Sequence, residues 1–140
     1  MRVIYAAIGL PAASTAALAG ALETLPNTTV IAAEEGSQAA LLMISASSAL
    51  DLAQAEATAG RDVVVVLDGY LTAVAASIHS LETAGFVAQH RSASGDDALM
   101  RALIFPTVDR AGVYRSSGPG GPSGSITLVI TAADASTGAQ

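Results

Sequence analysis

One run of apolar residues, from Val63 to Leu67, constrains the fold of this chain more than any other feature. Four of its five residues are valine, and no polar residue alternates with them. A strand of this kind is typically buried on both faces, as in a parallel sheet covered by helices, and the run is too short to span a membrane. Asp68 and Gly69 end the run, and an alanine-rich helical pattern follows. The sequence therefore predicts a buried strand, a tight turn and a helix.

Asp68 stands at the carboxyl end of this predicted central strand. Ligands of open α/β sheets bind at that edge, so a functional site should include Asp68. Its carboxylate could accept a hydrogen bond from a ribose hydroxyl or a base nitrogen. It could also cap the following helix by accepting hydrogen bonds from backbone N–H groups, and the two roles do not exclude each other.

Strand and helix patterns alternate along most of the chain. Strands are expected over residues 2–8, 28–33, 40–45, 63–67, 86–90 and 125–131, and helices over 12–25, 48–59, 70–83 and 96–103. Pro11 suits a first helical turn, Ser47 or Ser48 suits an N-cap, and Gly60 suits a helix stop. This order predicts an α/β fold, a three-layer sandwich with a mainly parallel, Rossmann-like sheet.

The C-terminal part is less regular. Residues 106–114 read as extended or irregular, and residues 116–124 form a loop rich in glycine, proline and serine. The strand over 125–131 is the candidate for an edge of the sheet. We expect one α/β domain over residues 1–132 and a polar tail over residues 133–140.

Composition excludes several kinds of chemistry. The chain has no cysteine and no lysine, which excludes thiolate metal sites, thiol nucleophiles and Schiff bases. Its net charge of −6 argues against nucleic acid as a partner. No apolar run is long enough for a membrane span, and strand plus helix accounts for the apolar N-terminal residues, so a cytoplasmic protein without a membrane partner is expected.

Two segments resemble one known family. Residues 64–76, with Asp68 and Gly69 at the turn, resemble the strand–Asp-Gly–helix of the nicotinate-nucleotide–dimethylbenzimidazole phosphoribosyltransferases, which make the lower-ligand nucleotide of cobamides. Residues 86–93 are similar to the family's strand that ends in His-Arg-Ser-Ala-Glu. More loosely, residues 6–9, ending at Gly9, resemble its glycine-rich turn before an alanine-rich helix. The resemblance implies a site that holds a nucleotide or a phosphate.

The chain also departs from this family. Leu10 and Pro11 interrupt the glycine-rich turn, and Ser94 stands where the family has a glutamate. The family's catalytic glutamate lies in a Gly-Glu-Gly motif near the C-terminus, and residues 115–120 contain no carboxylate. The chain is less than half the family's usual length. Binding without catalysis is therefore one expectation.

The second matching segment supplies the predicted anion site. His90 and Arg91 end a predicted strand, and Ser92 begins the turn into a helix. A guanidinium beside a helix N-terminus can hold a phosphate. Alternatively, Arg91 is a surface residue that pairs with Asp96 or Asp97.

Glu34 and Glu35 are the only candidates for catalytic carboxylates, and the alternative is that they belong to a solvent-exposed turn. The two histidines, eleven residues apart, do not make a metal site, so neither a metal nor a cofactor is expected. Two functions stay open. The chain is a small nucleotide- or phosphate-binding protein, with or without phosphoribosyltransferase activity, or it is a non-catalytic interaction or oligomerisation module. Because alanine-rich helices bury little area, we expect a homo-oligomer in either case.

Overall fold

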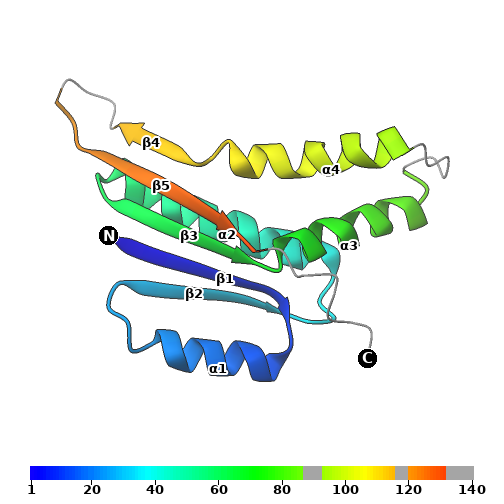
Figure 1. The fold of residues 1–140 in the computed structure, drawn as a ribbon, viewed down its shortest axis with the longest axis horizontal. Helices are drawn as coiled ribbons and strands as arrows, with labels where there is room; N and C mark the ends of the chain where they lie inside the picture. Colours follow the sequence, from blue (N-terminus) through cyan, green and yellow to red (C-terminus); the bar gives the residue numbers. More distant parts are fainter. Residues whose placement is uncertain (87–92, 116–119, 132–140) are drawn as a thin grey trace.

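The fold is that of a computed structural model, which describes residues 1–86, 93–115 and 120–131, except for the side chains of residues 93–97. Its elements are β1 (Arg2–Leu10), α1 (Ala12–Leu22), β2 (Thr28–Glu34), α2 (Ala39–Thr58), β3 (Asp62–Asp68), α3 (Tyr70–Thr83), α4 (Ala93–Val108), β4 (Gly112–Arg115) and β5 (Ser123–Ile130). The strands form one sheet in the order β2-β1-β3-β5-β4 (Figure 1). Only the pairing of β4 with β5 is antiparallel. The predicted α/β fold with a mainly parallel sheet is confirmed.

The helices lie on both faces of this sheet. The chain moves one way across the sheet from β1 to β2 and the opposite way from β2 to β3. Right-handed connections therefore place α1 on one face and α2 on the other. α3 and α4 join α2 on its face, because Tyr70 of α3 donates a hydrogen bond to α4 and Arg110, just after α4, pairs with Asp51 of α2. In Figure 1, α2 passes behind β3 and β5.

The hydrophobic core lies between the sheet and α2. Val63, Val65 and Leu67 of β3 are fully buried there. Facing them, α2 contributes a helically spaced row of small and medium side chains, namely Leu42, Ala46, Ala49, Leu50, Ala53 and Ala57. α3 completes the core with Tyr70, Ala73, Val74 and Ile78. Alanines let α2 lie close to the strands. None of the described helices is long and apolar enough to cross a membrane.

The expected strand over residues 40–45 is wrong, because α2 already begins at Ala39. A short apolar run fits a buried strand and a buried helix equally well by periodicity. The pattern over a longer segment identifies a helix, because buried positions recur every three or four residues from Leu42 to Ala57. The proposed N-caps Ser47 and Ser48 consequently lie inside the helix. Gly60 does end it, in the left-handed conformation with φ 85°.

The C-terminal strands differ from expectation in their placement. β5 is an interior strand, parallel to β3, and the edge strand is the short β4. The end of α4, from Pro106 to Val108, and most of β4 fall within the segment expected to be irregular. Pro106 has no N–H group, so the carbonyl oxygen four residues before it has no helical donor. The Tyr70 hydroxyl donates to the next carbonyl oxygen along the chain, that of Leu103, at 3.0 Å. The strand expected over 86–90 and the tail over 133–140 lie outside the described residues, apart from Phe86, which is in a bend.

Candidate functional site

The carboxyl ends of β1 and β3 are adjacent in the sheet, and the chain leaves them toward opposite faces. α1 follows β1 on one face and α3 follows β3 on the other. This is a topological switch point, the place where open α/β sheets bind ligands. Gly9 and Gly69, at the two strand ends, have φ of 70° and 81°. A Cβ atom on Gly69 would lie 2.1 Å from the carbonyl oxygen of Ile8, so this close approach of the two strand ends requires glycine.

Asp68 lies at this switch point, and two hydroxyl groups orient its carboxylate. Tyr5 Oη donates to Oδ2 at 2.6 Å, and Thr131 Oγ1 donates to Oδ1 at 2.5 Å. The Gly69 N–H donates to Thr131 Oγ1 at 3.3 Å, which fixes the threonine as a donor to Asp68. Each carboxylate oxygen has room for a further hydrogen bond. Because Asp68 is only partly buried, its carboxylate is held in one orientation and is still within reach of a ligand.

Tyr5 is affected by this contact in turn. Burial, followed by its hydrogen bond to Asp68 and the negative charge of that carboxylate, raises the pKa of Tyr5 to about 12. The phenol therefore keeps its proton at neutral pH and acts as a hydrogen-bond donor. It positions Asp68 and cannot serve as a base under those conditions.

The alternative role of Asp68 as a helix cap is wrong. The N-cap residue of α3 is Gly69, and no described side chain caps this helix end. Asp68 has its side chain on the α1 face of the sheet, the face of Val64 and Val66, whereas α3 runs along the opposite face. The hydroxyls of Tyr5 and Thr131 lie on the carboxylate's own face and take up its hydrogen bonds.

The other predicted site residues are placed as follows. Glu34 ends β2 and pairs with Leu10, and Glu35 donates its N–H to the Leu10 carbonyl oxygen at 3.0 Å. Both glutamates are exposed at the same edge of the sheet, beyond β1 from Asp68. The remaining predicted ligand-binding residues, His90, Arg91 and Ser92, lie outside the described residues, so their part in a phosphate site stays a prediction.

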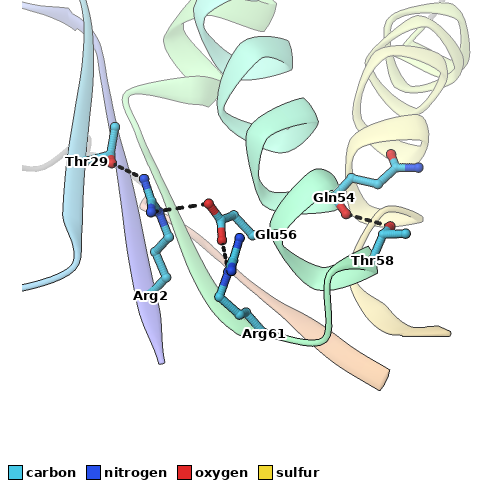
Figure 2. Close-up of polar contacts among 6 residues, drawn as sticks. All are labelled: Arg2, Thr29, Gln54, Glu56, Thr58 and Arg61. Atoms are coloured by element: carbon cyan, nitrogen blue, oxygen red, sulfur yellow. Dashed lines mark hydrogen bonds and ion pairs between the residues drawn. The ribbon is translucent and has the colours of Figure 1, made fainter. Parts of the chain in front are cut away.

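A second polar cluster lies at the opposite, amino edge of the sheet (Figure 2). Glu56 of α2 has a side chain only 10% exposed, and it pairs with Arg2 at 3.2 Å and with Arg61 through its other oxygen. Arg2 also donates to Thr29 Oγ1 of β2 at 3.0 Å. Through these contacts one buried carboxylate connects β1 and β2 to the start of β3.

This amino-edge cluster is better explained by structure than by ligand binding. A hollow of about 520 Å³ lies beside it, lined by Met1, Arg2, Asn27, Gly60, Arg61 and Asp62. However, both guanidinium groups already pair with Glu56. The Nε atom of Arg2 has no hydrogen-bond partner among the described residues, and it is buried, so a ligand in the hollow does not reach it. The carboxyl edge is the better candidate site.

Sequence reasoning missed Tyr5 and Thr131. Tyr5 is a hydroxyl-bearing side chain in a strand of apolar residues, which is a signal that its hydroxyl has a specific partner. Thr131 directly follows β5 and Asp68 is the last residue of β3, but the sequence did not show that these two strands are neighbours. Their contact depends on sheet order, which local patterns do not encode.

No protein-family model matches this chain, and no curated protein matches it. The assignment of the segments around Asp68 and Arg91 to a family therefore depends only on the resemblance of their residues. The similarity to the phosphoribosyltransferases named above stays a prediction.

Proposed function

We propose that this chain is a small nucleotide- or phosphate-binding α/β protein whose ligand lies at the carboxyl ends of β1 and β3. One observation carries the proposal. Asp68 stands at the switch point with its carboxylate oriented by Tyr5 and Thr131, and Gly69 allows the ends of β1 and β3 to approach each other closely there. Ligand sites in sheets of this kind form at this place.

Each part of the site suits one part of a nucleotide. The free acceptor positions of Asp68 suit a pair of ribose hydroxyls. The starts of α1 and α3 flank the switch point, and the first N–H groups of a helix have no partner within the helix. Such groups suit a phosphate. Neither Pro11 nor Gly69, the two N-cap residues, provides a side-chain hydrogen bond that would occupy them.

Binding is better supported than turnover. Transfer of a ribosyl group to a nitrogen nucleophile needs a base close to that nitrogen. Glu34 and Glu35 are exposed at the end of β2, with β1 between them and Asp68. A phosphoribosyltransferase-like activity in cobamide synthesis therefore stays the secondary form of this proposal, and nucleotide binding is its primary form.

Calorimetry with nicotinate mononucleotide and with inorganic phosphate tests the proposal. Asp68→Asn keeps the shape of the side chain but removes its charge and one acceptor. We expect nucleotide affinity to fall about three- to tenfold, the equivalent of one or two hydrogen bonds, while phosphate affinity does not fall. Asp62→Asn, at the other end of the same strand, is the matched control and should leave both affinities unchanged. No heat from the wild-type protein with either compound at millimolar concentration would refute the proposed function.

A further inference from the structure

The short helix α1 is almost entirely apolar, although none of its residues is buried by the described part of the chain. Its eleven residues are alanine, leucine and glycine except for Ser14 and Thr15. Thr15, Ala19 and Leu22 lie toward β2, and the opposite side, which includes Ala13 and Ala17, is exposed. A helix without a polar side is normally enclosed in a core. Something other than the described part of this chain is therefore expected to cover α1.

The same face of the sheet is also incompletely covered. α1 lies over β1 and β2, and no other described helix lies on this face above β3, β5 and β4. On that half, Val64 and Val66 of the central strand are partly exposed, Val129 is 43% exposed and Val113 is 71% exposed. The unbroken valine run of β3 is the pattern of a strand buried on both faces. The part of the chain that the structure describes buries only one of them.

We propose that a second copy of this chain covers this face in a two-fold symmetric dimer. The face has a raised half, formed by α1, and a bare half, formed by β3, β5 and β4. A two-fold axis parallel to the strands, lying between two facing sheets, brings β2 of one copy opposite β4 of the other. Each α1 then fills the space above the partner's bare half. Such self-complementarity is what an interface between identical surfaces requires.

The charges on this face agree with this arrangement. Glu23 directly follows α1. Arg115 is the last residue of β4 and has its side chain on the same face as α1, because it pairs with Ser123, and Ser123 and Ser125 lie on the face of Val64 and Val66. Both residues are at the amino edge of the sheet, Glu23 beside the outer strand β2 and Arg115 on the outer strand β4. Neither forms an ion pair with a described residue, and both are exposed. The proposed axis keeps the amino edges together, so Glu23 of each copy meets Arg115 of the other.

The size of the contact suits a dimer of moderate affinity. Three strands about 4.8 Å apart and about six residues long give roughly 300 Å² of sheet, and the exposed sides of α1 add a similar area. The total, on the order of 600 Å² per copy, lies somewhat below the standard of about 800 Å². We therefore expect a dissociation constant in the micromolar range. Residues 132–140 do not suit this face, since their largest apolar side chain is alanine.

Sedimentation equilibrium from about 1 to 100 μM, a range that brackets this dissociation constant, measures the dimer directly. Ala17→Arg places a charge on the exposed side of α1 with little loss of helix propensity. It should raise the dissociation constant at least about tenfold. Ala55→Arg makes the same change at an exposed position of α2, on the other face, and should leave it unchanged.

A charge reversal tests the orientation of the two copies. Glu23→Arg or Arg115→Glu alone should weaken the dimer about tenfold or more, because each change turns two attractive contacts into repulsive ones. The double variant should restore affinity to within about threefold of wild type. Asp109→Arg, an equal charge change just after α4 on the other face, is the control.

Three outcomes would overturn the inference. The first is a wild-type protein that is folded and monomeric throughout this range, which would mean that another protein or a further domain covers the face. The second is a dimer that Ala17→Arg and Ala55→Arg weaken equally. The third is a double variant no better than the two single ones. Circular dichroism on every variant identifies any that has failed to fold, and the charge reversals at exposed sites then decide the question. None of these results depends on nucleotide binding.

Discussion

The two edges of the sheet use charged side chains in different ways. At the amino edge, Glu56 is nearly buried and both of its oxygens pair with arginines, so its charge is fully used in holding secondary-structure elements together. At the carboxyl edge, Asp68 is held by two neutral hydroxyls, forms no ion pair with a described residue and has acceptor positions left over. Charge thus stabilises the amino edge, whereas backbone geometry shapes the carboxyl edge. Only the second arrangement leaves a group available to a ligand.

The largest effect is expected from Gly69→Ala, which tests the backbone geometry of the carboxyl edge. The new Cβ atom would lie 2.1 Å from the Ile8 carbonyl oxygen, at a positive φ. We expect a loss of about 3 kcal/mol or more in the free energy of unfolding, measured in urea. Gly36→Ala is the matched control, because Gly36 also has a positive φ but no neighbouring atom within 4 Å, and it should cost about 1 kcal/mol. Equal losses in the two variants would contradict the role assigned to close strand approach.

The next effect in size is that of Glu56→Ala, which tests the ion cluster of the amino edge. Its removal leaves Arg2 and Arg61 without their shared partner. Breaking a buried ion pair costs about 3–5 kcal/mol, and the 58% exposure of the Arg61 side chain reduces this to about 2–3 kcal/mol. Asp51→Ala removes the 71% exposed partner of Arg110 and should cost less than about 1 kcal/mol. If both variants lose the same stability, the amino edge is not specially dependent on its buried charge.

The fold was largely predictable from sequence because its signals are local. The unbroken valine run gave β3, and the Asp68-Gly69 turn correctly marked the strand end. The limits appeared where local signals are ambiguous. The segment from Ala40 to Ser45 fits a strand on its own, and only the spacing of buried residues out to Ala57 identifies it as part of α2.

The candidate site was predictable only in part, for a different reason. Asp68 and Gly9 could be placed at the carboxyl edge because parallel strands end there together. The partners of Asp68 could not, because Tyr5 and Thr131 are each 63 residues from it in sequence. Thr131 reaches it only because β5 inserts beside β3, and the sequence had suggested an edge position for that strand.

The smallest expected effect comes from Tyr5→Phe, which tests the neutral donors of the carboxyl edge through their pH dependence. The pKa of Tyr5 is raised from 10.0 to about 12 in the folded chain, first by burial and then by Asp68. A raised pKa stabilises the fold fully below pH 10, and this contribution is lost as the pH rises through 12, because the unfolded chain releases its proton first.

The hydroxyl should be worth about 1 kcal/mol at pH 8, since solvent screens a partly exposed pair. The chain contains no lysine or cysteine, so mainly tyrosines titrate in this window. Urea unfolding at intervals from pH 8 to 12 should show wild type more stable than Tyr5→Phe below pH 10, with this advantage lost between pH 10 and 12. Parallel curves would mean that the Tyr5 hydroxyl does not hold Asp68 in the way the carboxyl edge requires.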